Sequence, residues 1–573
     1  MTSNSGTGYG RDSSRLLDTL NPGQLRAATT ESSALVWAGP GTGKTQVTAS
    51  RAGWLIETGR CKPHELLVVT FTNRAVKEFR DRLETLLGTS AAAQVRVSTF
   101  HSLALSLVEI QQQLGERERF RLLNSETRFK LLEELIRDAL KRQPQSLKVK
   151  GAEGEPANFK RLVEQVGHLI SSLKTRQEEE SPNELSISNK VEMYFEDYLV
   201  DEPVHKLIQQ VWPRYRQHLT ARGLLDVDDL IPQATITLKK WPALVRLPGV
   251  GVQQVLLDET QDTSPGQLEL LLTLMHTSGE QHSGSQKQNQ PELIAVGDSR
   301  QQIFSYLHSG PYQRLAKFLP QTASMSLDIQ YRFGPTINRA ASALSWRLGS
   351  DLAVRPARLE DDPDQEFSAL FAGEKVPRGQ LPLTIYEAED EEEEAGFVAQ
   401  EILRVREHRP KVQIAVLVRT RAQGEQVGRF LTKSSISHCV LTGIDSKIVE
   451  ANSPVNNPGL APGCKPDLRP EGPDTTPVTI STIHASKGAE FEVVFVPGLA
   501  QGLFPVGQNR LLEDLRLFFV AITRSRYLVY LSYPGHFKRP RSLNRYDTKP
   551  AGAENETGRS EKAAPSIFLS ILP

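Results

Sequence analysis

Residues 38–45, which read AGPGTGKT, have the residue types and spacing of a phosphate-binding loop, with alanine where the consensus has its first glycine. The apolar residues 34–37 predict a buried strand before it, and residues 46–58 can continue as a helix. A glycine-rich turn between a strand and a helix directs several backbone N–H groups at one point, where a phosphate can bind. Lys44 would reach the β- and γ-phosphates, and the Thr45 hydroxyl would bind Mg²⁺. The predicted nucleotide-binding residues are therefore Ala38, Gly39, Pro40, Gly41, Thr42, Gly43, Lys44 and Thr45.

A pair of carboxylates could supply the rest of an ATP-hydrolysing site. Asp258 and Glu259 follow the apolar run 255–257, so a buried strand would deliver both side chains at its carboxyl end. Hydrolysis of a nucleoside triphosphate needs a second group that holds Mg²⁺ and a group that orients or activates water. We expect Asp258 to hold Mg²⁺ and Glu259 to polarise the attacking water. Acid pairs after apolar runs are common, but the residues TQDT at 260–263 make this pair more specific.

Two blocks in which strand patterns alternate with helical patterns must position these groups. The first block covers residues 20–105 and 222–324, and the second covers 325–445 and 478–536. This alternation is typical of parallel sheets with crossover helices, so the sequence predicts an α/β fold with two lobes. Residues 106–221 carry long helical stripes without strand patterns, and they predict a helical insertion in the first lobe.

The remaining segments and the composition limit what else the chain can be. Residues 1–19 predict a disordered N-terminus, residues 446–477 a flexible linker rich in Pro, Gly and Asn, and residues 537–573 a basic, Pro-rich tail. The 68 basic and 68 acidic residues balance, so any binding of nucleic acid must come from a local groove. No apolar run approaches the ~20 residues of a membrane span, and the polar N-terminus does not read as a signal peptide. Three cysteines far apart predict no disulfide framework.

Seven motifs give the sequence a resemblance to the UvrD/Rep/PcrA group of superfamily 1 DNA helicases. Each later motif is weak alone, but their order and spacing around the phosphate loop leave little room for chance. In family order, beginning with the Q motif, they lie at residues 20–24, 38–45, 258–263, 296–301, 330–332, 482–491 and 519–524.

The resemblance implies roles for residues around the nucleotide. Gln24 would bond the edge of adenine and Tyr331 would stack on it, while Glu490 would lie near the ribose. Gln301 would contact the γ-phosphate. The resemblance also implies two RecA-like lobes with ATP in the cleft between them.

Two arginines from the second lobe would complete this site. Arg332 and Arg524 resemble the family's arginine fingers, whose charge stabilises the negative charge that spreads over the phosphates during transfer. They would reach the γ-phosphate only when the cleft closes. Hydrolysis would remove that anchor, so the nucleotide would control a hinge between the lobes.

A single nucleic-acid strand would be held by polar contacts to phosphate and by aromatic side chains that stack on bases. On spacing alone, core packing is as plausible for each aromatic, but the resemblance favours stacking for Phe71 and Tyr306. Lys487 and Thr482 are either contacts to phosphate or ordinary strand-end residues, and the resemblance slightly favours contacts to phosphate. The predicted DNA-binding residues are Phe71, Thr72, Asn73, His101, Tyr306, Thr482 and Lys487.

The sequence also departs from the family pattern. Tyr306 and Leu307 stand where the family usually has Trp and Arg in its third motif, so stacking survives and one polar link is lost. Leu515 stands where a first Arg is usual, and Phe519 replaces the Tyr of the sixth motif. Between the fourth and fifth motifs, where these helicases insert a second accessory domain, only the short segment 446–477 is present, and it is too short for its own core.

The function that the resemblance implies is an ATP-dependent DNA helicase or translocase that moves 3′→5′ on single-stranded DNA in repair, recombination or replication restart. Its cofactors would be ATP and Mg²⁺, and its partners single-stranded DNA, 3′-tailed duplex DNA and a further protein if unwinding needs one. We expect it in the cytoplasm, associated with the nucleoid and with no membrane. Two alternatives stay open: a helicase-like binding subunit with weak ATPase, and the motor subunit of a helicase–nuclease complex. RNA also stays open, because stacking and backbone contacts do not distinguish the sugar.

Overall fold

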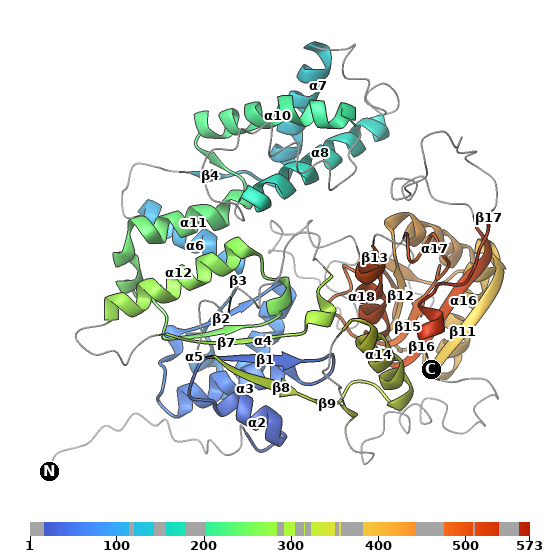
Figure 1. Cartoon of the computed structure of the whole chain (residues 1–573), viewed down its shortest axis with the longest axis horizontal. Coiled ribbons are helices and arrows are strands. Elements are labelled where there is room, and N and C mark those ends of the chain that lie inside the picture. The colour runs from blue at the N-terminus through green and yellow to red at the C-terminus, as the bar shows by residue number, and fades with distance from the viewer. Residues whose placement is uncertain are drawn as a thin grey trace.

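Two parallel β-sheets, each covered by helices, form two α/β lobes that lie beside each other, and a separate group of helices stands above the first lobe (Figure 1). This arrangement confirms the predicted α/β fold with two RecA-like lobes and a helical insertion in the first. The computed structural model describes residues 17–113, 120–142, 156–177, 202–282, 291–303, 315, 322–349, 355–356, 382–441, 475–507, 510–537 and 561–572.

The first sheet has the strand order β3-β2-β6-β7-β1-β8, and all its neighbouring strands are parallel. Leu66 and Val68 point into the core on one face of the sheet, and Leu67 and Val69 point into the core on the other. Strands buried on both faces read as continuous apolar runs, which is why the sequence pattern found them. The strands are β1 (Ala34–Ala38), β2 (Leu66–Thr70), β3 (Arg96–Thr99), β6 (Gln254–Leu257), β7 (Glu292–Gly297) and β8 (Ala323–Leu327).

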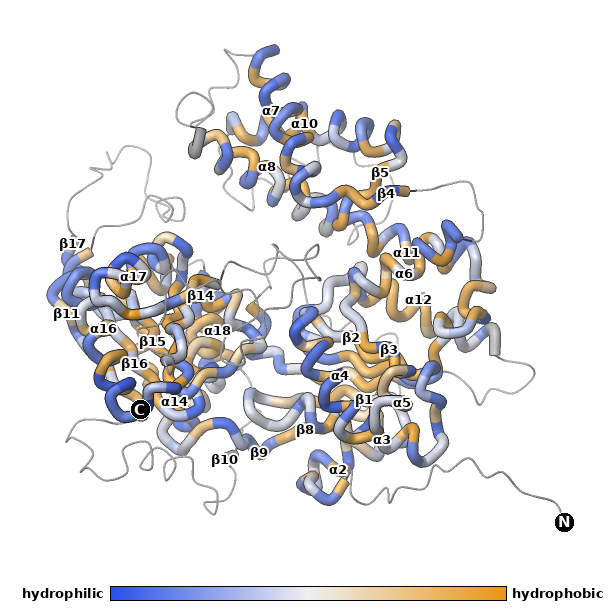
Figure 2. Tube along the Cα trace, turned by 180° about the vertical axis from the view of Figure 1, so that it is seen from behind, coloured by the Kyte–Doolittle hydropathy of each residue, from blue (hydrophilic) through white to orange (hydrophobic). Residues whose placement is uncertain are grey.

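Helices cover both faces of this sheet, and Figure 2 shows apolar residues gathered along its strands. One face carries α2 (Pro22–Thr29), α3 (Lys44–Glu57), α4 (Asn73–Leu87) and α5 (Thr89–Ala92). The other face carries α6 (Phe100–Gln113), α11 (Leu230–Lys240) and α12 (Pro265–His282).

The first lobe is larger than its predicted bounds. Leu107 and Val108 of α6 pack into its core, so this helix belongs to the lobe although the insertion was expected to begin at residue 106. β8 pairs with β1 as far as Leu327, three residues past the expected end at 324. Both differences have the same reason. The predicted boundaries lie where the sequence pattern changes, whereas a helix or strand that packs against the first lobe continues past that point.

The helical insertion is built from α7 (Ser125–Arg142), α8 (Pro156–Gln177) and α10 (Glu202–Ala221). Their apolar stripes share one core, in which Trp212 and Tyr215 of α10 are fully buried. A short parallel pair, β4 (Arg121–Leu122) with β5 (Leu224–Leu225), brings the two ends of the insertion together next to the first lobe.

A buried carboxylate ties the three insertion helices to the chain that returns to the first lobe. Asp226 is fully buried, and it accepts hydrogen bonds from Lys174 Nζ at 3.0 Å and Tyr215 Oη at 2.7 Å. Arg128 Nε lies 3.3 Å from the same carboxylate oxygen. Burial alone would raise the pKa of Asp226, but Lys174 and Arg128 outweigh burial and lower it. Asp226 therefore stays charged and joins α7, α8 and α10 at one point.

The second sheet has the order β11-β16-β15-β12-β14-β13 with parallel neighbours, and β17 adds antiparallel to the end of β16. Its apolar faces pack against helices in two core clusters. The strands are β11 (Leu383–Asp390), β12 (Ile414–Val418), β13 (His438–Leu441), β14 (Val478–Thr482), β15 (Phe491–Val496), β16 (Ser525–Phe537) and β17 (Glu561–Lys562). The helices are α14 (Pro335–Arg347), α16 (Glu391–His408), α17 (Arg421–Lys433) and α18 (Leu511–Ile522).

Two expectations about the second half of the chain were wrong. Residues 561–572 of the predicted tail pack onto the second lobe, and Phe568 lies in its core. Cys439 is disulfide-bonded, although no pairing was expected, while Cys61 is free and buried. The N-terminal residues 1–16 and residues 442–474, which include most of the predicted linker, lie outside the described residues. Among the residues that the structure describes, no helix is both long and apolar enough to span a bilayer.

Candidate nucleotide site

The predicted phosphate loop connects β1 to α3, and two of its glycines adopt backbone angles that favour glycine. Gly41 has φ +72° and Gly43 has φ +82°. A Cβ on Gly41 would lie 2.5 Å from the Cβ of Arg332, and one on Gly43 would lie 2.6 Å from Nε2 of Gln24. The loop thus needs glycine both for its turn and for the close approach of two other predicted site residues.

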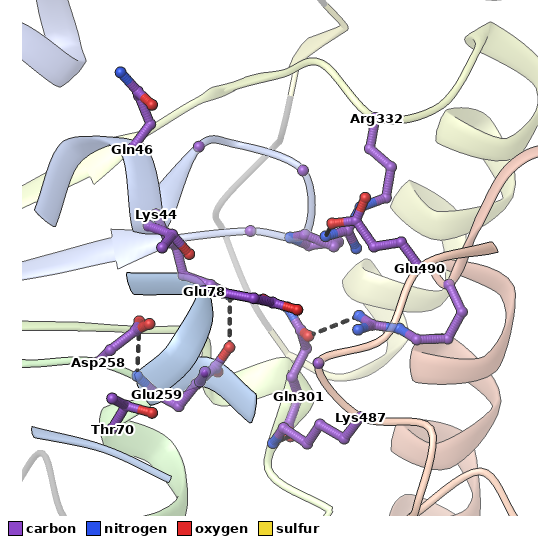
Figure 3. Close-up of a pocket in the computed structure, with 18 of the residues that line it drawn as sticks. Lys44, Gln46, Thr70, Glu78, Asp258, Glu259, Gln301, Arg332, Lys487 and Glu490 are labelled. Carbon is purple, nitrogen blue, oxygen red and sulfur yellow. Dashed lines mark hydrogen bonds and ion pairs between the residues drawn. The ribbon is translucent and has the colours of Figure 1, made fainter. Parts of the chain in front are cut away.

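A cavity of about 580 Å³ lies between the phosphate loop and the second lobe and is lined by residues of both lobes (Figure 3). This volume lies within the ~300–1,000 Å³ range typical of ligand sites. From the first lobe the cavity is lined by Gly39, Pro40, Gly41, Gly43, Lys44, Thr45, Gln46, Thr70, Phe71, Thr72, Ala75, Glu78, Arg82, Asp258, Glu259, Asp262 and Gln301. From the segments that follow β8 it is lined by Tyr331, Arg332, Lys487, Gly488, Glu490, Arg524, Arg526 and Tyr527.

The carboxylate pair lies at the carboxyl end of β6, as the sequence predicts. Asp258 accepts a hydrogen bond from the backbone N–H of Glu259 at 3.0 Å, and Glu259 Oε1 lies 3.8 Å from Lys44 Nζ. Glu259 has φ +52°, an uncommon angle for a residue with a side chain, and such strain often occurs at functional sites. Gln261 donates a hydrogen bond to the second oxygen of Glu259.

The two carboxylates have opposite electrostatic surroundings. Burial and the neighbouring charge of Glu259 raise the pKa of Asp258. Burial would also raise the pKa of Glu259, but Lys44 and Lys487 outweigh it and lower that pKa. A cation bound at Asp258 would favour the charged carboxylate and so offset the effects of burial and of Glu259. Carboxylate and hydroxyl oxygens suit Mg²⁺. Asp258 and Thr45 line the same cavity and therefore fit Mg²⁺ bound together with nucleotide phosphates.

Side chains from both lobes meet at the inner end of the cavity. Arg524 is almost fully buried and donates a hydrogen bond to Gln301 Oε1 at 3.1 Å. Burial and the charge of Arg332 lower the pKa of Arg524 to about 9. Lys487 Nζ lies 2.5 Å from Asp262 Oδ2 and donates to the backbone oxygen of Gln301 at 2.5 Å. Gln301, for which the family resemblance implies a contact to the γ-phosphate, therefore lies between two cations of the second lobe.

Arg332 lies directly beside Gly41 of the phosphate loop and lines the cavity. It donates to the backbone oxygen of Thr523 at 3.0 Å and pairs with Glu490, which also pairs with Arg526 at 3.1 Å. Among the described residues, the buried Nε of Arg332 and the Oγ1 of Thr70 have no hydrogen-bond partner. Buried polar atoms are rarely left without a partner, so these two atoms fit a ligand in the cavity.

The residues predicted to hold the base lie together beside the phosphate loop. Gln24 caps α2 by accepting from the backbone of Asn21 at 3.0 Å, and it donates to the backbone oxygen of Thr42 at 3.0 Å. Tyr331 is 49% exposed, its N–H donates to Gly41 O at 2.8 Å, and its hydroxyl accepts from Asn21 Nδ2 at 2.8 Å. The exposed ring of Tyr331 can stack on a flat base next to the loop.

The predicted DNA-binding residues are only partly brought together. Phe71 and Thr72 line the nucleotide cavity, and Thr72 caps α4 by accepting from Ala75 N at 3.1 Å. Asn73 begins α4 and is exposed, His101 lies in the first turn of α6, and Thr482 ends β14.

One further member of that set, Lys487, is paired within the protein. The side chain of Lys487 is buried at the nucleotide cavity and paired with Asp262, so the structure does not present it as a contact to DNA phosphate. Tyr306 lies outside the described residues. Sequence reasoning missed several residues of the cavity wall, above all Asp262, although it stands inside the quoted motif. The others are Gln46, Thr70, Ala75, Glu78, Arg82, Gly488, Arg526 and Tyr527.

Comparison with known proteins gives consistent matches. Residues 20–317 match the UvrD/REP helicase N-terminal domain, and residues 466–535 match the UvrD-like helicase C-terminal domain. The chain is 28% identical over 434 residues to an ATP-dependent DNA helicase PcrA of Staphylococcus aureus, covering 75% of this chain and 51% of that protein. Over the same length and with the same coverage it is 27% identical to a PcrA of Staphylococcus epidermidis. The chain thus spans about half the length of the curated relatives that it matches.

Proposed function

Because the chain belongs to the UvrD/REP helicase family, we propose that it is an ATP-dependent DNA helicase or translocase that moves 3′→5′ on single-stranded DNA. One observation carries the proposal. Arg332 and Arg524 of the second lobe line the same cavity as the phosphate loop and the carboxylates of the first lobe. A nucleotide in this cavity would be touched from both lobes, so its hydrolysis would change how the lobes are held.

The residues divide the hydrolytic work among them. Mg²⁺ held by Thr45 and Asp258 would neutralise charge on the β- and γ-phosphates. Glu259, with its lowered pKa, stays ionised and can accept a proton from water. Arg332 and Arg524 supply positive charge where negative charge spreads in the transition state. When the γ-phosphate leaves, these arginines lose their partner and the closed arrangement is weakened.

ATP hydrolysis with and without single-stranded DNA tests the proposal. We expect DNA to stimulate hydrolysis in the wild-type chain and Lys44→Ala to abolish it while strand binding remains. Lys62→Ala is the matched control, since Lys62 is an exposed lysine of the same lobe, and it should behave as wild type. Hydrolysis by Lys44→Ala would refute the assignment of the loop. An absence of stimulation would favour a helicase-like binding subunit with weak ATPase.

Direction and unwinding need a second experiment. Strand displacement should occur on a duplex with a 3′ single-stranded tail and not on one with a 5′ tail. Competition between single-stranded DNA and RNA of equal length would show which sugar is preferred. We also propose a role in repair, recombination or replication restart on nucleoid DNA in the cytoplasm. This part of the proposal rests on the family alone.

The length of chain between β13 and β14 bears on unwinding. β13 ends at Leu441 and β14 begins at Val478, so residues 442–477 stand where the family inserts a second accessory domain. We propose that the protein unwinds with little self-inhibition or engages duplex DNA with a partner protein. Addition of cell extract to the strand-displacement assay separates these versions: an unchanged rate refutes the partner version, and an increased rate supports it.

A further inference from the structure

The C-terminal segment, residues 561–572, returns to the second lobe and is anchored on two of its elements. β17 pairs with the end of β16, and Ala563 N donates to Gly535 O at 2.7 Å. On the other side, Gln501 N donates to Ala564 O at 2.9 Å and Ser566 N donates to Leu499 O at 2.7 Å. The segment is therefore held between β16 and the loop that follows β15, and its backbone path is fixed.

Phe568 is the apolar anchor of this segment. It is 1% exposed and lies in a cluster of three phenylalanine rings. Its ring centroid is 5.6 Å from that of Phe518 in a stacked arrangement and 5.7 Å from that of Phe504 edge-on. Such aromatic contacts contribute beyond the area they bury and prefer a definite geometry. The adjacent Ile567, by contrast, is 47% exposed.

The partner of Phe568 lies on the helix that carries the arginine site. Phe518 belongs to α18, and two residues later the backbone oxygen of Val520 accepts from Arg524 Nε at 3.1 Å. Just past the end of the same helix, the backbone oxygen of Thr523 accepts from Arg332 Nη1 at 3.0 Å. Two of the arginines that line the cavity, Arg524 and Arg332, are thus held by the C-terminal end of α18. A shift of this helix would move both guanidinium groups.

We propose that Phe568 is a positioning residue for ATP hydrolysis: docking of the C-terminal segment fixes α18 and, through it, the places of Arg524 and Arg332. The inference rests on the proposed function of the site as an ATPase. It assigns a role in that chemistry to a residue outside every motif that the sequence reveals. Phe568 itself does not line the cavity.

The full-length chain with Phe568→Ala tests the inference. We expect kcat for ATP to fall about 10-fold or more, because a small displacement of a charge that stabilises the transition state is costly. The affinity for ADP, measured with a fluorescent analogue, should change less than about twofold, since the phosphate loop lies on the other lobe. Ile567→Ala is the matched control and should keep wild-type kcat. Phe568→Leu, which fills part of the same space, should recover only part of the loss.

A double-variant cycle separates positioning from mere stability. If Phe568 acts through Arg524, then Phe568→Ala should slow an Arg524→Ala chain far less than it slows the wild-type chain. Equal slowing in both backgrounds, or loss of ADP affinity in parallel with kcat, would overturn the inference. Should Phe568→Ala fail to fold, Phe568→Leu carries the same cycle, with a smaller kcat loss expected and wild-type kcat as the overturning result. Hydrolysis without DNA serves as the readout throughout, so a failure of DNA stimulation would refute only the proposed helicase function.

Discussion

Arg524 on the second lobe and Gln301 on the first share a hydrogen bond of 3.1 Å that crosses the nucleotide cavity. Lys487 crosses the same boundary to Asp262 and to the backbone of Gln301. The second lobe supplies the donors and the first lobe supplies the acceptors. Separation of the lobes would therefore break these contacts, and we expect a terminal phosphate at this point to favour the closed arrangement.

Replacement of Arg524 by alanine should lower kcat for ATP by about 10³-fold, because arginine fingers contribute about 10³–10⁵ to phosphoryl transfer. Nucleotide binding should change much less, since the phosphate loop remains intact. Steady-state hydrolysis and ADP titration measure the two effects. Arg347→Ala, at an exposed arginine of α14 in the same lobe, should behave as wild type. A loss of less than twofold in Arg524→Ala would remove this residue from the chemistry.

Gly41→Ala should abolish the close approach of the lobes, whereas Gly59→Ala should not. Both glycines have positive φ, +72° and +68°, so both variants carry similar backbone strain of about 1–2 kcal/mol. Only at Gly41 would the new methyl group collide with another residue, Arg332, since nothing lies within 4 Å of a Cβ at Gly59. Thermal unfolding should show comparable destabilisation in the two variants, and ATP hydrolysis should fall in Gly41→Ala alone. Equal hydrolysis in both would contradict the proposed contact.

Much of the fold was predictable because the strands of both sheets are buried on two faces. Short apolar runs such as LLVV at 66–69 and VLL at 255–257 predict buried strands. The two acids after the second run therefore lie at the edge of the sheet where its parallel strands end. The predicted phosphate loop was recognisable because the positive φ angles of Gly41 and Gly43 already favour glycine, whereas the approach of Arg332 and Gln24 to these glycines could not be read from the loop.

The parts that sequence could not supply depend on partners far away along the chain. Lys487 pairs with Asp262, and Phe568 packs on Phe518. Both pairs are far apart in sequence, and the hydrophobic periodicity of single elements cannot predict such contacts. Nothing in the sequence singles out Asp226, and only the tertiary fold brings Lys174 to it. A short apolar segment such as 567–569 was predicted as part of a tail, because the sequence does not show the core against which it packs.

Lys487→Ala distinguishes the nucleotide site from the DNA site. Because the Lys487 ammonium pairs with Asp262 at the cavity, we expect kcat for ATP to fall while the Kd for single-stranded DNA stays within about twofold. Fluorescence anisotropy with a labelled oligonucleotide measures the Kd. The opposite result, weaker DNA binding with unchanged hydrolysis of ATP, would restore the assignment of Lys487 to DNA phosphate.

Asp226→Ala should destabilise the chain by about 3–5 kcal/mol. The substitution removes the fully buried carboxylate that pairs with Lys174 and Arg128. Asp138→Ala provides the control: Asp138 is partly exposed in the same insertion and pairs with Arg142 and Arg214. Exposed pairs contribute only about 0–1 kcal/mol. Urea unfolding of both variants measures the difference. Equal free energies of unfolding would mean that the Asp226 network does not hold the insertion together.

Glu394→Gln should make the protein more stable at neutral and alkaline pH. Glu394 is buried at the start of α16, where it accepts from Gly498 N at 2.8 Å, and burial raises its pKa from 4.5 to about 7. Between these pH values the folded chain binds more protons than the unfolded chain, so wild-type stability falls as pH rises through this window. Glutamine stays neutral and keeps the hydrogen bond, so the variant should gain up to about 3 kcal/mol over wild type at pH 8 and little at pH 4. Unfolding across this pH range tests the slope, with Glu392→Gln on the exposed face of the same turn as control. A difference between variant and wild type that does not change with pH would show that Glu394 is ionised in the folded chain.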